Sequence, residues 1–149
     1  MTTDTADGTA TRLIADLGQR VGIPQLRPDA HGCCRLMFDG DQIVELQPVP
    51  AQGRWLVSCT IRQHRPDDQA VRLLMQGNYL GAGLGGGWAS LDPKGCAAVH
   101  LPLAFHEASV DALLQVVELV LQHAERWLQR FTSVAPTLVS GHRREIDWA

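Results

Sequence analysis

The sequence predicts an α+β fold, in which helices pack on an antiparallel sheet of five strands. Three observations support this prediction. The patterned segments follow the order α-β-β-β-α-β-β-α, short turns join the strand segments, and the longest amphipathic segment comes last. The chain has 149 residues, of which 45% are hydrophobic, so it can bury a core as one domain without disulfide bonds.

The first helix is predicted over residues 9–21, because apolar side chains recur there at helical spacing. Gly22 and Pro24 end the helix. Residues 1–8 are small and polar, and we expect a disordered N-terminus there. The side chains that form the apolar face are Leu13, Ile14, Leu17 and Val21.

Three strands are predicted next, over residues 33–38, 42–47 and 54–63. The turn Asp39-Gly40-Asp41 favours a hairpin, since Asp-Gly tolerates the positive φ angles that tight turns need. Pro48 is expected to stop the second strand, because proline cannot donate a ladder hydrogen bond. The three strands therefore form an antiparallel meander.

The second half begins with a helix predicted from Pro66 to Gln76, or as far as Tyr79. Proline and two aspartates in its first turn favour a helix start. A glycine cluster follows, and then strands over residues 87–91 and 96–103. The turn between them, residues 92–95, has proline at its second position and glycine at its fourth.

The last helix is predicted over residues 109–131, with Ser109 as its N-cap. Its apolar stripe is wider than one packing face, so we expect most of the helix to be covered. The pattern decays over residues 132–149, which we expect to form a loose tail. The domain therefore spans residues 9–131.

Charge and composition exclude several classes of protein. The formal net charge of −3 argues against a nucleic-acid partner, because phosphate neutralisation needs a basic face. No apolar run approaches the ~18 residues that span a bilayer, and the polar N-terminus does not resemble a signal peptide. We therefore expect a cytoplasmic protein without a membrane partner. Four cysteines without zinc spacing are interpreted as buried free thiols: Cys33, Cys34, Cys59 and Cys96.

The residues that could carry chemistry do not form a catalytic set. Gly81, Gly83 and Gly86 match the letters of a dinucleotide motif, but a helix precedes them and a strand follows, which is the reverse of the required order. His106 and Glu107 stand before the last helix without a nucleophile motif. We expect no enzymatic activity, no cofactor and no metal site.

At this point the residues resemble a known family, the class I chaperones of bacterial type III secretion, often called Tir chaperone-like. The resemblance covers residues 9–131. It is carried by Leu73-Leu74 with Asn78 and Leu80, the glycine cluster ending in Gly85-Gly86-Gly87, the strand Trp88 to Asp92, Gly95, and the long helix with Trp127.

The resemblance implies a homodimer that binds the N-terminal segment of a secreted effector in extended form and keeps it competent for export. An open sheet also has edges, to which an extended peptide can add a strand. The second apolar face of the helix at 66–76 and the glycine cluster predict a dimer interface through that helix and the strand at 87–91. Its expected residues are Leu73, Leu80, Leu84, Trp88 and Leu91.

The resemblance also implies that the effector contacts the first helix and the first three strands. The residues there are Leu13, Ile14, Leu17, Leu36, Phe38, Val44, Leu46, Trp55 and Val57. One face of these strands must cover the core, so only part of this set can be exposed, and alternation alone leaves either face possible.

Two alternative functions remain at this stage. One is a small enzyme or nucleotide-binding protein that uses the glycine cluster at residues 81–87 and His106. The other is a ligand-binding α+β module with no role in secretion.

Overall fold

The computed structural model describes residues 3–81 and 84–133, with side chains from residue 8 onward. It confirms the predicted fold class and element order. The helices and strands are α1 (Thr3–Val21), β1 (Cys34–Phe38), β2 (Gln42–Val49), β3 (Arg54–Ile61), α2 (Asp68–Gly77), β4 (Trp88–Leu91), β5 (Ala97–Ala104) and α3 (Val110–Ser133). Short 3-10 turns lie at Pro50–Gln52, Tyr79–Gly81 and Phe105–Glu107.

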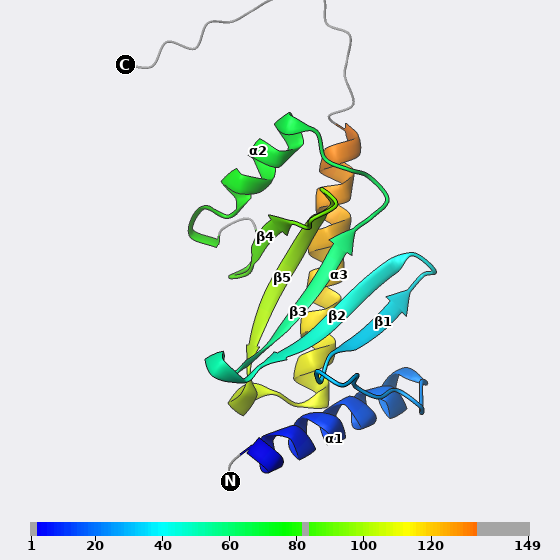
Figure 1. Cartoon of the computed structure of the whole chain (residues 1–149). Helices are drawn as coiled ribbons and strands as arrows, with labels where there is room; N and C mark the ends of the chain where they lie inside the picture. Colours follow the sequence, from blue (N-terminus) through cyan, green and yellow to red (C-terminus); the bar gives the residue numbers. More distant parts are fainter. Residues whose placement is uncertain (1–2, 82–83, 134–149) are drawn as a thin grey trace, which may run out of the picture.

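The five strands form one sheet in the order β1-β2-β3-β5-β4, and all neighbours are antiparallel (Figure 1). The hairpin between β1 and β2 turns at Asp39 and Gly40, which have φ angles of 50° and 82°. Because of the strand order, β1 and β4 are the two edges of the sheet.

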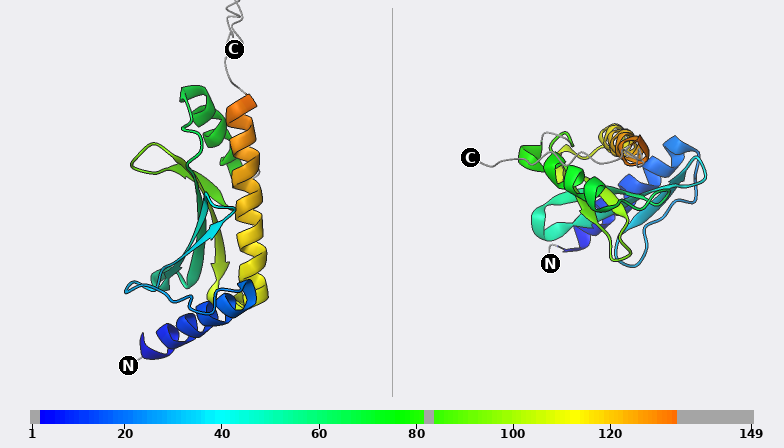
Figure 2. Two further views of the ribbon diagram at one scale, coloured as in Figure 1. Left: turned by 90° about the vertical axis from the view of Figure 1, so that its right-hand side faces the viewer. Right: turned by 90° about the horizontal axis from the view of Figure 1, so that it is seen from above.

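The core lies between the sheet and α3. Figure 2 shows α3 lying along one face of the curved sheet, with α1 across one end of that helix. Every second residue of β3, from Trp55 to Ile61, points to this side and is buried. Buried residues of α3, among them Leu113, Val120 and Trp127, pack against them. The opposite face carries the other residues of each strand.

The ends of α1 and α3 differ from the prediction. α1 begins at Thr3, so residues 3–8 are helical, and the expected disorder is wrong for them. No proline interrupts the segment, and one glycine in a helix costs only about 1 kcal/mol. α3 starts as predicted, with the N–H of Ala112 donating to Ser109 Oγ at 3.1 Å, and continues to Ser133. The rest of the expected tail lies outside the described residues.

The second strand does not stop at Pro48. β2 continues to Val49, and Pro48 pairs with Trp55 of β3. β1 begins at Cys34, opposite Leu46, so β2 has only one neighbour from Gln47 onward. A proline without an N–H is tolerated there, because its nitrogen faces the unpaired side of the strand.

Candidate functional site

The predicted effector-contacting residues lie mostly inside the protein. Seven of the nine are at most 2% exposed and pack in the core: Ile14, Leu17, Leu36, Val44, Leu46, Trp55 and Val57. Leu13 and Phe38 are partly buried against the same core. The prediction of these seven as surface contacts is therefore wrong for this fold. The five strand residues point to the sheet face that α3 covers, and Ile14 and Leu17 point from α1 into the same core.

The face of the sheet opposite α3 carries the other set of side chains. One row crosses the whole sheet in register, from β1 to β4: Arg35, Glu45, Ser58, His100 and Trp88. We call this side the open face. It is mixed in character, with exposed Met37 beside polar groups.

His100 forms the centre of that row. Its Nδ1 lies 2.7 Å from Ser58 Oγ and its Nε2 lies 2.7 Å from Ser90 Oγ, so one imidazole bridges three strands. Burial lowers the pKa of His100, and the charge of Glu45 opposes that shift. The neutral ring is therefore favoured, with one hydroxyl donating to it and the other accepting from it.

Trp88 lies over His100 rather than projecting freely. The ring centroids of Trp88 and His100 are 5.7 Å apart, and the Arg54 guanidinium carbon lies 5.1 Å from the Trp88 ring centroid. Trp88, which was predicted in the dimer interface, is thus half-buried on the open face of its own chain.

The predicted dimer residues divide into two groups. Leu80 is 88% exposed and Leu91 is also exposed, whereas Leu84 is fully buried in the core. Leu84 is thus wrong as an interface residue, because the loop after the 3-10 turn folds its side chain inward. Leu73 packs partly against the core. The sequence prediction missed two exposed apolar neighbours in this region, Met75 and Tyr79.

The two edges of the sheet are not equivalent. At β4, the Asn78 side chain donates from Nδ2 to the Ala89 carbonyl at 3.0 Å and accepts from the Ala89 N–H at 2.7 Å. The amide of Asn78 thus occupies the position that a neighbouring strand would take. The sequence prediction used Asn78 only as a family signal and gave it no role.

The direction of the free backbone groups at β1 follows from Ala89. In an antiparallel sheet, the N–H and C=O groups of one residue both point toward the same neighbouring strand. Across a row of residues in register, the pairs of adjacent strands therefore alternate between hydrogen-bonded and non-hydrogen-bonded, and the groups of Ala89 point away from β5 because Asn78 binds them. The register runs from Ala89 through Val99, Cys59 and Val44 to Leu36. Leu36 therefore bonds to β2, and the N–H and C=O groups of Arg35 and Met37 point outward. β1 pairs with no second strand in the described part of the chain.

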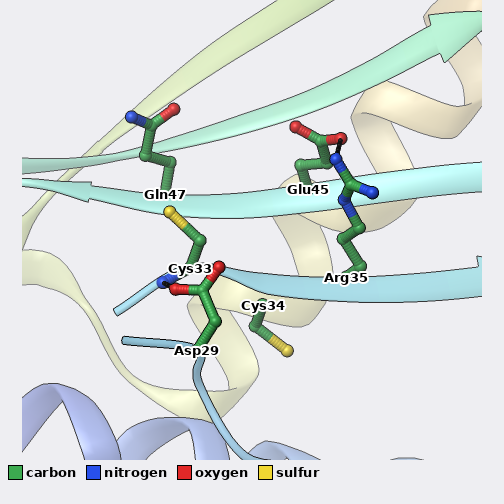
Figure 3. Close-up of a pocket in the computed structure, with 6 residues that line it drawn as sticks. All are labelled: Asp29, Cys33, Cys34, Arg35, Glu45 and Gln47. Atoms are coloured by element: carbon green, nitrogen blue, oxygen red, sulfur yellow. Dashed lines mark hydrogen bonds and ion pairs between the residues drawn. The ribbon is translucent and has the colours of Figure 1, made fainter. Parts of the chain in front are cut away.

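A recess lies where β1 begins. Figure 3 shows six residues around it, and its volume is about 390 Å³. Arg35 Nη2 lies 3.0 Å from Glu45 Oε1 across its rim. The lining residues are Asp29, Cys33, Cys34, Arg35, Glu45 and Gln47.

The candidate reactive groups do not assemble into a centre. His106 Nε2 and Glu107 Oε1 are 3.9 Å apart and both side chains are exposed. The glycine cluster leads from a 3-10 turn into β4 and opens no helix, and Gly83 lies outside the described residues. All four cysteines are free, and burial raises the pKa of the Cys34 and Cys59 thiols to about 11. Residues 3–81 and 84–133 contain no metal-binding cluster and no helix long and apolar enough to cross a membrane.

Comparison with known proteins identifies the family. The model of the Tir chaperone protein (CesT) family matches residues 12–128, which is most of the chain. The chain belongs to this family. A comparison with curated protein sequences finds no match.

Several solved structures share the fold. The ExsC-ExsE complex matches with a TM-score of 0.76 and 20% identity, covering 84% of this chain and 95% of that one. The HopA1-SchA chaperone-effector complex matches with a TM-score of 0.74 and 21% identity, covering 85% and 98%. The Yersinia pestis type III secretion chaperone SycH, in complex with a stable fragment of YscM2, matches with a TM-score of 0.64 and 14% identity, covering 79% and 98%.

Family membership confirms the resemblance drawn from the motifs and favours neither a nucleotide-binding protein nor a small enzyme. The glycine cluster has a structural role instead. A Cβ at Gly87 would collide with the His100 carbonyl oxygen and lie 2.6 Å from Leu101 Cδ2, so only glycine lets this backbone approach β5.

Proposed function

We propose that this protein is a cytoplasmic type III secretion chaperone, which binds the N-terminal segment of a secreted effector in extended form and keeps it competent for export. Its family and the chaperone–effector complex that shares its fold support this function. The observation that carries the binding mode is the unpaired β1 edge, with outward backbone groups at Arg35 and Met37.

The proposed client strand pairs with β1 and not with β4. A strand that adds to an edge needs free N–H and C=O groups on that edge. Asn78 already satisfies those of Ala89 on β4. On β1 the outward groups alternate with the inward-bonded Leu36, and the Met37 side chain is 63% exposed beside the proposed strand. No step in this function requires a nucleophile, a cofactor or ATP.

The chaperone acts as a homodimer in this proposal. Met75, Tyr79, Leu80 and Leu91 are the exposed apolar side chains of α2, the following 3-10 turn and β4. Large exposed apolar patches mark interaction sites in soluble proteins. Leu80 also adopts φ 54°, an unusual backbone conformation for leucine, which presents its side chain outward.

Strand addition is tested by comparing Met37→Pro with Met37→Ala. Both variants lose the methionine side chain, but only proline loses the outward N–H, and neither removes a β1–β2 ladder bond. Binders are selected first from a phage-displayed library of random 16-residue peptides on the purified wild-type chain. We expect Met37→Pro to lose peptide binding by about tenfold relative to Met37→Ala, since a backbone hydrogen bond and the fit of the strand are lost together.

Hydrogen exchange provides the second measurement. The amides of Arg35 and Met37 should be protected when a selected peptide binds, while the amide of Leu36 should be protected in both states. Equal peptide binding by Met37→Pro and Met37→Ala, with no new protection at Arg35 and Met37, would rule out strand addition at β1.

A further inference from the structure

The recess at the start of β1 has a preformed wall. The N–H of Asp29 donates to the Cys33 carbonyl at 2.8 Å, and the N–H of Cys33 donates back to Asp29 Oδ1 at 2.9 Å. The N–H of His31 donates to the same oxygen at 2.8 Å. Gly32 lies against Pro48 of β2, where a Cβ would come within 3.0 Å of the proline ring. The loop is therefore tied to itself and to the sheet before any ligand arrives.

The lining of the recess carries a small negative charge. Its charged side chains are two carboxylates, Asp29 and Glu45, and one guanidinium, Arg35, so their formal sum is 1 − 2 = −1. The two backbone N–H donors hold the pKa of Asp29 below its ordinary value, so this group is ionised at neutral pH. Burial, then the charges of Asp29 and Glu45, raise the pKa of the Cys33 thiol, and Arg35 opposes them.

The ion pair at the rim does not close the recess. Arg35 and Glu45 approach to 3.0 Å, but the Arg35 side chain is 70% exposed and that of Glu45 is 41% exposed. Exposed pairs of this kind are worth only about 0–1 kcal/mol, so an incoming cation can compete with Arg35 for Glu45.

The recess also adjoins the edge that accepts the client strand. Arg35 lines the recess and presents outward backbone groups at the β1 edge. A strand added there lies about 4.8 Å from β1 and ~9.6 Å from Glu45 on β2. Among natural side chains, only lysine and arginine combine positive charge with the length to cross that distance.

We propose that this recess is a side-chain subsite that selects a lysine or arginine of the client strand, placed beside Asp29 and Glu45. This inference rests on the proposed strand addition at β1, and it adds a charge requirement to the client sequence. A client carboxylate could pair only with Arg35, and it would face the carboxylates of Asp29 and Glu45.

The test is a comparison of peptides selected from the random 16-residue library by four forms of the full chain. These are the wild type, Asp29→Asn, Glu45→Gln and the double variant. Both substitutions keep the size of the side chain, and Asn at position 29 retains the oxygen that accepts from Cys33. The control, Glu125→Gln, removes an exposed carboxylate from the far side of α3.

The wild type and the control should enrich lysine or arginine at one fixed position of the aligned peptides. The double variant should lose that preference, and a lysine-to-norleucine change in a selected peptide should weaken wild-type binding two- to fivefold. The same change should leave binding to the double variant unaltered.

Three outcomes would overturn the subsite. The enriched peptides could lack a basic position, they could prefer acidic residues, or the double variant could keep the preference for a basic residue. These outcomes leave strand addition intact if Met37→Pro still binds peptide about tenfold more weakly than Met37→Ala. Failure of the wild type to enrich any peptide would refute strand addition, and the subsite with it.

Discussion

Leu80 and Leu84 provide a sharp test of the dimer surface, because they are four residues apart and have opposite environments. Leu80 is 88% exposed and Leu84 is fully buried. Leu84→Ala removes core atoms, a change that typically costs about 2–5 kcal/mol of unfolding free energy. At roughly 2–4 °C per kcal/mol for a chain of this size, its melting temperature should fall by about 5–20 °C. The protein should remain a dimer below that temperature.

Leu80→Ala should have the reverse effect. Burying one leucine in an interface contributes about 1.5–3 kcal/mol, and a symmetric dimer contains the substitution twice. The loss of about 3–6 kcal/mol raises the dimer dissociation constant by two to four orders of magnitude. Surface substitutions usually change the stability of the subunit by less than about 0.5 kcal/mol.

The assay is sedimentation equilibrium over a concentration series, together with thermal unfolding of each variant at one fixed concentration. Concentration must be held constant because dimerisation itself raises the apparent melting temperature. A wild type that is monomeric at micromolar concentration would refute the homodimer. A Leu80→Ala variant that keeps the wild-type dissociation constant would refute this surface.

Two further predictions concern the interior of the fold. Gly87→Ala should lower the unfolding free energy, measured by chemical denaturation, by about 3 kcal/mol or more, because the added Cβ meets the His100 carbonyl oxygen. Gly86→Ala should lower it by only about 1 kcal/mol of backbone strain, because Gly86 has a φ of 89° and open space around it. Equal losses in the two variants would contradict the close approach at Gly87. Burial lowers the pKa of His100 and of His123 below 6.5. Their contribution to stability is therefore fully present above pH 6.5 and is lost as pH falls through the folded-state values. The unfolding free energy of His100→Gln, measured from pH 8 to pH 5, should therefore fall less steeply than that of the wild type, and an unchanged slope would show that His100 does not contribute.

The sequence carried enough local information to predict the elements. Helical spacing, the Asp39-Gly40 turn and the Ser109 cap are local signals. The structure contains the predicted helices, turn and cap, although α1 begins earlier and α3 ends later than predicted. The local signals gave wrong element boundaries where contacts with other parts of the chain determine the structure. Pro48 is tolerated within β2 because β1 begins opposite Leu46 and does not extend beside Pro48. No sequence pattern around a proline reveals how far a neighbouring strand extends.

The orientation of the strands was the main thing that the sequence left open. Val44 and Leu46 alternate with Glu45, but in β3 Trp55 and Val57 alternate with Leu56, so both faces carry apolar residues. Only packing against α3 determines that Trp55 points inward while Trp88 lies on the open face. The predicted client contacts were consequently assigned to the covered face.

Asn78 links the two halves of the proposed function. Its position after α2 places it between the surface that carries Tyr79 and Leu80 and the edge of β4, and its amide satisfies Ala89 in both directions. On the four residues of β4 this leaves only Leu91 with free outward backbone groups, so the edge has little to offer an extended peptide, and its exposed apolar side chains are the better contact for a partner. The edge at β1 keeps its backbone groups and its charged recess. One side of the sheet is therefore suited to a second copy of the chain, which is recognised by apolar surface, and the other to a client, which is recognised by its backbone and by one basic side chain.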